Sequence, residues 1–289
     1  MASLVFTACA SDEPTDDGVI RLSSSVASAI TRANTSDAIQ DEQFISGAQI
    51  FVEAYKTGQA STYTTGNYST TNTSGAMSGS LYYPSDMSNI DICAYYPSTV
   101  SSSTTSFSVN ASQTTANVAN YRSSDLMYAT KLTDKAKGST HALTFKHALS
   151  KIIVTITNGD GVSEADISGN VTAVKINNTK PTAEFTISGG AVGTITASGT
   201  AADIDITGTT KANHTGIIVP QTLTANTPFI TVTYNGTDYT YAIPSDGKTF
   251  EAGKAYTYAL TLSAAGISLS SVSITNWTTG TGDNQTMIL

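Results

Sequence analysis

The sequence predicts an all-β protein, and three observations support this prediction. Only 12% of the 289 residues are charged, against about a quarter in a typical domain, and Ser, Thr, Asn and Gly supply the polarity instead. Helical surfaces favour Lys, Glu and Arg, whereas the outer faces of sheets favour Thr and Ser. Short alternating runs separated by Gly, Asn and Asp recur in the second half, and residues 145–156 give the strongest strand signal.

The length and the charge limit the domain count and the classes of partner. A chain of this length can form two domains, each with its own core. We expect a leader and tether over residues 1–17 and two β domains over residues 18–144 and 145–289. The net charge of −8 argues against a nucleic-acid partner, which needs a basic face to neutralise its phosphates. No apolar run is long enough for a transmembrane helix.

The stretch over residues 145–156 is predicted to be a central strand between the two domains. It is rich in β-branched residues, and apolar side chains occur at both parities of a period-two pattern. A strand with two apolar faces is expected in the interior of a sheet rather than at its edge. The faces are Ala148, Ile152, Val154 and Ile156 on one side and Phe145, Leu149 and Ile153 on the other.

The N-terminal residues resemble the end of a bacterial lipoprotein signal. Leu4 to Cys9 place an apolar and then small residues before a cysteine, which such a signal marks for cleavage and lipidation. Acidic residues in the polar tether 10–18 resemble the surface-export signal of Bacteroidota lipoproteins. The basic start and most of the apolar core of a leader are missing, so a chance cysteine is the alternative. Lipidation at Cys9 would hold the protein at the cell outer membrane.

The first half reads as strands separated by long polar segments. Residues 56–80 and 98–120 are dominated by Ser, Thr, Asn and Gly and are expected to form a long hairpin or loops. Near the N-terminus, Arg32 lies among small, polar residues that we expect to be exposed, and residues 37–44 could form a helical turn. The predicted strands are 19–22 and 26–30 (one strand or a pair), 47–55 and 90–96.

The second half gives the best local prediction, a hairpin of residues 228–234 and 237–243 across Asn235-Gly236. Asn-Gly is the preferred pair for a type I′ turn. A two-residue loop pairs Tyr234 with Thr237, Val232 with Tyr239 and Ile230 with Tyr241 on one face. Other short strands are expected at 171–176, 183–187, 204–206 and 216–219.

Two further strands are expected near the C-terminus. Residues 255–262 alternate, with Tyr256, Tyr258, Leu260 and Leu262 on the buried face. In residues 267–274 the apolar positions change parity between Leu269 and Val272, which predicts a β-bulge.

The sequence holds no constellation typical of an enzyme, a cofactor site or a metal site. There is no Ser–His–Asp set, phosphate-binding loop or dinucleotide fingerprint, and no acid or thiol accompanies His141 and His147 at metal-ligand spacing. His147 is interpreted as a partnered histidine of the core or the domain junction, and Cys93 as a small packed residue. Asp203 and Asp205 alternate on one strand and signal calcium only weakly. Most tyrosines fall at strand spacing, which favours core packing over sugar stacking.

Six segments, in order, resemble the fimbrillin-like proteins of Bacteroidales (major and minor fimbrial subunits). Each is unspecific alone, but together they span nearly the whole chain. The segments are Asp91–Pro97, Ser124–Ala129, Leu143–Lys151, Ile218–Thr222, Phe250–Tyr258 and Ile274–Trp277.

The resemblance implies two tandem transthyretin-like β-sandwich domains and a role as a cell-surface pilus subunit in adhesion. Such subunits travel as lipoproteins; a trypsin-like, Arg-specific protease removes the first strand, and a strand from another subunit fills the groove. The match for the cut is Arg32, with Arg21 as the second choice. The removable strand would hold Val19, Ile20, Leu22, Val26 and Ile30, and the donor candidates are Ile267, Leu269, Val272, Ile274 and Trp277.

The resemblance implies other pilus subunits and a host or bacterial surface ligand as partners, and no cofactor. A second hypothesis is a monomeric surface lipoprotein that binds glycans. An exposed aromatic platform or a calcium site in residues 56–80 or 98–120 would favour it.

Overall fold

The computed structural model describes residues 17–26, 44–71, 75–206, 208, 213–277 and 285–287, and strands are the dominant regular element among them. The all-β prediction is therefore confirmed, and the finer description as two transthyretin-like sandwiches stays a prediction. Within the described residues, no helix combines the length and apolarity needed to cross a membrane. The helical elements are η1 (Thr115–Asn117), α1 (Val118–Ser123) and α2 (Glu164–Asn170).

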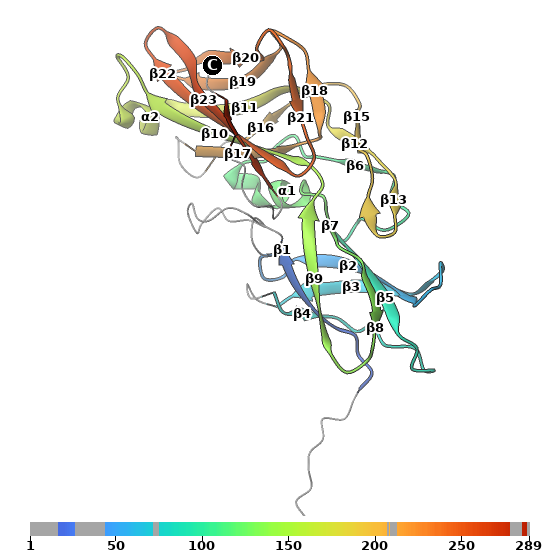
Figure 1. Cartoon of the computed structure of the whole chain (residues 1–289). Coiled ribbons are helices and arrows are strands. Elements are labelled where there is room, and N and C mark those ends of the chain that lie inside the picture. Colours follow the sequence, from blue (N-terminus) through green and yellow to red (C-terminus); the bar gives the residue numbers. More distant parts are fainter. Residues whose placement is uncertain are drawn as a thin grey trace, which may run out of the picture.

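Strands of the first half form one sheet, which lies apart from the sheets of the second half (Figure 1). This sheet has eight strands and surrounds its own apolar core. Its order is β1-β9-β7-β5-β2-β3-β4, and β8 pairs with β5 beside this path. The strands are β1 (Arg21–Val26), β2 (Gln49–Lys56), β3 (Thr62–Thr70), β4 (Met77–Ser78), β5 (Ile90–Tyr96), β7 (Met127–Ala129), β8 (Leu132–Lys135) and β9 (Thr140–His147).

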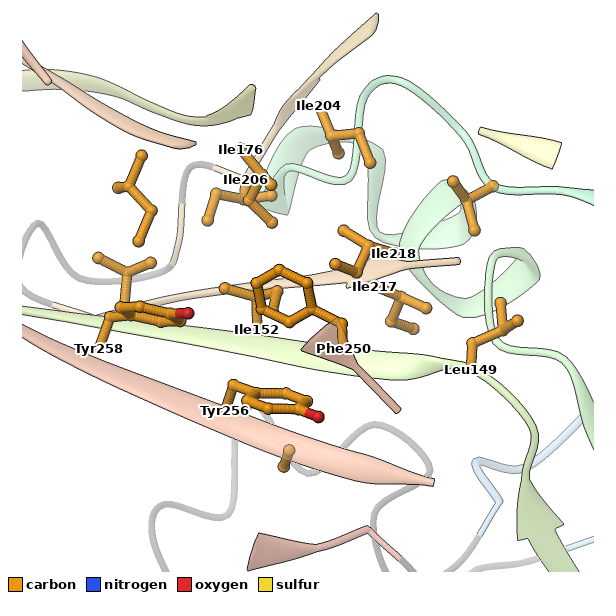
Figure 2. Packing of buried hydrophobic residues seen from close by; sticks show 14 of the residues in the cluster. Leu149, Ile152, Ile176, Ile204, Ile206, Ile217, Ile218, Phe250, Tyr256 and Tyr258 are labelled. Atoms are coloured by element: carbon orange, nitrogen blue, oxygen red, sulfur yellow. The ribbon is translucent and has the colours of Figure 1, made fainter. Parts of the chain in front are cut away.

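Most strands of the second half form a five-stranded and a four-stranded sheet, which share a second core (Figure 2). The five-stranded sheet has the order β17-β10-β22-β23-β24 and the four-stranded sheet the order β16-β11-β19-β20. The strands are β10 (Ser150–Asn158), β11 (Val171–Thr179), β16 (Ala202–Asp205), β17 (Asn213–Ile218), β19 (Pro228–Tyr234), β20 (Thr237–Ala242), β22 (Lys254–Ser263), β23 (Gly266–Asn276) and β24 (Gln285–Met287).

Three small sheets complete the described structure. One of them, with the order β15-β12-β6, joins the two halves of the chain, because β6 precedes residue 145 and β12 follows it. The segment expected as a loop over residues 98–120 thus packs on the second core. The strands are β6 (Ser106–Ser108), β12 (Thr182–Glu184), β13 (Ile187–Ser188), β14 (Ala191–Val192), β15 (Thr196–Ser198), β18 (Gln221–Leu223) and β21 (Lys248–Phe250).

The prediction of one central strand over residues 145–156 is wrong, because the stretch is divided between β9 and β10. The chain leaves the first sheet after His147 and enters the five-stranded sheet at Ser150. The backbone N–H of Ala148 donates to the Leu126 carbonyl at 2.9 Å, and the Leu149 side chain is fully buried between the strands. Residues 145–156 therefore carry apolar side chains at both parities because the chain passes here from the first core to the second.

The hairpin and bulge predictions are confirmed. Strands β19 and β20 pair in the expected register, and Asn235 and Gly236 have φ angles of 49° and 74°, as a type I′ turn requires. Between β22 and β23 the register shifts so that Ser270 has no register partner on β22, which is the bulge. In residues 56–80, β3 pairs with β2 as a hairpin. The helical turn expected over 37–44 lies outside the described residues, except for Phe44.

The β13–β14 hairpin reaches from the second half onto the first sheet. Gly190 at its tip has a φ of +83°, and a Cβ atom there would lie 2.6 Å from the Cys93 sulfur on β5. Cys93 is buried, as predicted, and burial raises the pKa of its thiol. A glycine is therefore required both by the backbone conformation and by the close approach.

We predict that Gly190→Ala lowers the free energy of unfolding more than Gly138→Ala does. Gly138 also has a positive φ, of +96°, but nothing lies within 4 Å of its added Cβ. Both variants carry the backbone cost, and only Gly190→Ala adds overpacking, worth about 1–3 kcal/mol. Urea denaturation measures both, and equal losses would contradict the contact.

Candidate functional site

The first strand, β1, occupies a place in the first sheet with hydrogen bonds on both sides. It pairs in parallel with β9 over six register pairs, from Arg21 with Thr140 to Val26 with Phe145. On its other side it faces residues 75–83, where Ile20 N–H donates to the Leu81 carbonyl at 2.8 Å. Ser24 N–H donates to the Gly75 carbonyl at 2.7 Å. The strand therefore closes the sheet around the first core.

The inward side chains of β1 and of the residue before it are part of that core. Ile20, Leu22 and Val26 are 0%, 2% and 6% exposed. Each buried aliphatic side chain contributes about 1.5–3 kcal/mol. The Tyr68 hydroxyl donates to the Ile20 carbonyl at 2.6 Å, and burial raises the pKa of Tyr68 to about 12. Removing β1 would expose an apolar slot and leave Tyr68 without this acceptor.

Gly75 is a site residue that the sequence reasoning did not single out. Its φ is +87°, and a Cβ atom there would collide with the Ser24 carbonyl oxygen. A side chain at this position would therefore push β1 out of its place. A glycine in a Ser- and Thr-rich stretch carries no distinct signal, so only the paired strand reveals the constraint.

The predicted residues around the removable strand fall into two groups. Val19 is half-buried and bridges to Tyr82, and Ile20, Leu22 and Val26 line the core. Arg21 lies within β1, and its exposed side chain forms an ion pair with Asp17 at 3.0 Å. The other three predicted residues lie outside the described residues: Cys9, Ile30 and Arg32.

The donor candidates occupy β23 and the position after it. β23 pairs with β22 over ten register pairs and with β24 over three. Its apolar side chains are half-buried against the second core: Ile267, Leu269, Val272 and Ile274. Trp277 is 2% exposed, and its ring stacks on the His147 ring with centroids 3.8 Å apart and planes 7° apart.

His147 is a buried junction residue, as predicted, but only one ring nitrogen is hydrogen-bonded, because its buried Nε2 has no hydrogen-bond partner within the described structure. Its Nδ1 lies 2.9 Å from Asp125 Oδ1, and both side chains are buried. The stack on Trp277 joins the end of β9 to the end of β23. His141, on the same face of β9, bonds with the Tyr83 hydroxyl at 2.7 Å, and burial lowers its pKa. Among the residues described, no three His, Cys, Asp or Glu side chains group closely enough for a metal ion.

We predict that Leu22→Ala lowers the free energy of unfolding by about 2–5 kcal/mol, because it opens a cavity under β1. The matched control is Ser25→Ala on the exposed face of the same strand, which should change stability by less than about 0.5 kcal/mol. Urea denaturation followed by circular dichroism measures both. Similar effects of the two variants would contradict the burial of β1.

We predict that Asp125→Ala costs about 3–5 kcal/mol, since it leaves His147 buried without its partner. The control is Asp205→Ala, which removes an exposed pair with Lys175 at 3.7 Å and should cost less than about 1 kcal/mol. Trp277 is the only tryptophan of the chain, so its fluorescence during denaturation reports on this junction. A cost for Asp125→Ala as small as that of the control would rule out a structural role for the pair.

Comparison with known proteins identifies the family. The fimbrillin-like family matches residues 31–277 of the chain. The chain is 32% identical over 214 residues to "Putative fimbrium subunit Fim1C" of Bacteroides uniformis, covering 71% of this chain and 67% of that protein. Such subunits are structural proteins of fimbriae at the cell surface.

Solved structures agree with this match. A crystal structure titled as a putative cell adhesion protein of Bacteroides uniformis is 26% identical, with a TM-score of 0.69, and covers 92% of this chain and 100% of that one. A second such structure, from Bacteroides ovatus, is 17% identical with a TM-score of 0.63, covers 91% and 99%, and shows the shared fold alone. The chain belongs to the fimbrillin-like family.

Proposed function

We propose that the chain is an exported fimbrial subunit that polymerises when β1 is removed and a strand of another subunit takes its place. The observation that carries the proposal is the position of β1, which is bonded along both edges and fills the first core. Its removal leaves unpaired backbone on β9 and an apolar slot. A strand from outside repairs both by β-augmentation, and such a joint can last long without a covalent bond.

Arg32 is the proposed cleavage site, for a structural reason. The sequence contains three arginines: Arg21, Arg32 and Arg122. Arg21 lies in the paired strand β1, and Arg122 lies in α1 with a partly buried side chain. Proteases cut exposed, irregular backbone more readily than paired strands or helices. The two described arginines are thus poor cleavage sites, so we assign the cut by an Arg-specific, trypsin-like enzyme to Arg32, which lies outside the described residues.

A single cut after Arg32 would have two consequences. Cys9, the proposed lipidation site, and β1 both precede Arg32 in the chain. Cleavage would separate the subunit from its proposed anchor in the outer membrane and, once β1 leaves, open the groove. Release and activation for assembly would thus be one event, which keeps subunits from polymerising before they reach the surface.

The inward residues of the first strand suggest a register for the donor. Ile20, Leu22, Ser24 and Val26 point into the first core. Ile267, Leu269 and Ser271 repeat the first three residue types at the same spacing, whereas Ser273 stands in the place of Val26. In this register the donor places its larger side chains where Ile20 and Leu22 were, and a serine beside Gly75. The competing donor is the segment after Trp277, which would leave the ten register pairs of β23 with β22 intact.

We predict that an Arg-specific protease converts the monomer into ladders or filaments, and that Arg32→Ala stays uncut and monomeric. Size-exclusion chromatography with mass analysis measures the change, and mass spectrometry locates the cut. The control is Arg21→Ala, which should be cut and should assemble like the parent. Assembly of Arg32→Ala after protease treatment would contradict the cleavage model, as would a clean cut that leaves only monomers.

Trp277 fluorescence distinguishes the two donors. If β23 is donated, Trp277 leaves its stack on His147 and its emission shifts to longer wavelengths in the assembled protein. If the segment after Trp277 is donated, the emission stays that of the buried ring. Monomer cleaved in the presence of excess β1 peptide, residues 19–27, is the reference.

A monomeric, glycan-binding surface lipoprotein is the second candidate. Tyr63 in β3 lies in the segment 56–80 and is 41% exposed, with the Lys56 ammonium group 5.9 Å from its ring centroid. An exposed aromatic ring can stack on a sugar. If the protease neither cuts the protein nor makes it assemble, this second candidate function is favoured.

A further inference from the structure

The large apolar side chains that are exposed in the described part of the chain lie at one end of the first sheet. They are Tyr63, Tyr82 and Met87, which are 41%, 54% and 59% exposed. Apolar side chains scattered singly over a surface need no explanation, whereas a group of them at one place marks an interaction surface. We call these three residues the apolar tip.

Tyr63 and Met87 are connected through one ion pair. The Lys56 ammonium group lies 5.9 Å from the Tyr63 ring centroid. It also lies 2.6 Å from a carboxylate oxygen of Asp86, which precedes Met87 in the chain. The end of β2, the start of β3 and the turn before β5 therefore bring these two apolar side chains to the same end of the sheet.

Tyr82 and Met87 lie where the chain enters the first sheet. The Lys137 ammonium group lies 3.7 Å from the Met87 sulfur. A Cβ atom at Gly18 would lie 3.9 Å from the Lys137 side chain and 4.0 Å from the Tyr82 ring, and Val19 bridges to Tyr82. These residues come just before β1, which begins at the lower end of the first sheet in Figure 1. The apolar tip therefore surrounds the point at which the N-terminal segment joins the fold.

The proposed lipid anchor is close to this point along the chain. Asp17, the first described residue, follows Cys9 by eight positions, and this length of chain spans at most about 29 Å. A lipid on Cys9 would therefore keep the apolar tip within that distance of the membrane. Confinement by so short a tether gives an effective concentration of about millimolar, so a contact made by a few apolar side chains is occupied.

The chemistry of the apolar tip suits the interfacial layer of a membrane. Tyrosine is enriched there, because its ring is apolar and its hydroxyl group stays in water. A lysine can lay its methylene stem along apolar groups while its ammonium group stays in water. Several basic side chains at this end are paired with an acid, as Lys56 is with Asp86. Apolar contact, rather than attraction to anionic lipids, is therefore the interaction expected.

We propose that the apolar tip rests on the interfacial layer of the membrane that holds the Cys9 lipid, until cleavage releases the subunit. This inference rests on the lipid anchor of the proposed function. Strand β1 runs from the tip to Val26, which pairs with Phe145 near the junction of the two halves. The chain thus leaves β1 toward Arg32 at the end away from the membrane. Docking would hold the start of β1 at the membrane and turn the cleavage segment outward.

The test anchors the full chain to vesicles and places a tryptophan reporter at the tip. The Cys9 thiol is coupled to a maleimide lipid in phosphatidylcholine vesicles whose acyl chains carry bromine near the headgroup. Cys9→Ser is the uncoupled control, because the remaining thiol, Cys93, is buried. Tyr82→Trp reports on the tip. The matched control is Thr237→Trp, at an exposed position of the β19–β20 hairpin in the second half.

We expect coupling to quench the emission of the Tyr82→Trp protein and to shift it to shorter wavelengths, whereas the Thr237→Trp protein keeps its emission. Trp277 adds the same background to both and is measured in the parent protein. Adding Met87→Ser and Tyr63→Ser to Tyr82→Trp should reduce the quenching, because the reporter then lacks its apolar neighbours. The melting temperature of each variant shows that it is folded.

Three results would overturn the proposal. The first is equal quenching of the Tyr82→Trp and Thr237→Trp proteins. The second is quenching that Met87→Ser and Tyr63→Ser leave unchanged, because the tether alone would then explain the proximity. The third is a dimer in solution, without vesicles, that Met87→Ser dissociates, since the tip would then contact a second copy of the chain.

These outcomes are independent of the proposed function. The maleimide lipid replaces the natural anchor, so none of them depends on lipidation in the cell, which incorporation of radiolabelled palmitate at Cys9 tests separately. None of them bears on cleavage at Arg32 or on strand exchange.

Discussion

The paired position of β1 is the constraint on which the rest of the first half depends. One edge of β1 is bonded to β9 and the other to residues 75–83, so the sheet surrounds its core only while a strand lies there. The strand comes from the very start of the described chain rather than from the middle of the fold. A peripheral segment therefore completes an interior, and this separation makes exchange with another chain geometrically simple.

The strand β9 links this position to the far end of the chain. Its residues 140–145 pair with β1, and His147 at its end stacks on Trp277, which follows β23. The buried Asp125 holds the imidazole in place. Both segments proposed to exchange thus contact the same strand. The crossing at Ala148 and Leu149 connects that strand directly to the second core, in which Figure 2 shows Leu149.

Local pairings were predictable from the sequence, whereas long-range pairings were not. Asn235-Gly236 fixes the hairpin register through the turn, and the parity change before Val272 reveals the bulge, because both signals lie within a few residues. The pairing of β1 with β9 joins residues more than a hundred positions apart, and Ser-rich β1 has no distinguishing pattern. The helix α2 has a capping-box signal in Ser163 and Asp166 that strand periodicity did not capture.

A disulfide between β1 and β9 tests most directly whether β1 must leave for assembly. Ser25 and Thr144 are register partners with exposed side chains, so Ser25→Cys with Thr144→Cys, in a Cys9→Ser background, can link the strands. The account predicts that the oxidised protein is cut after Arg32 yet stays monomeric, and that a reductant then starts polymerisation. Polymerisation of the cut, oxidised protein would contradict the account, because the groove would still hold its own strand.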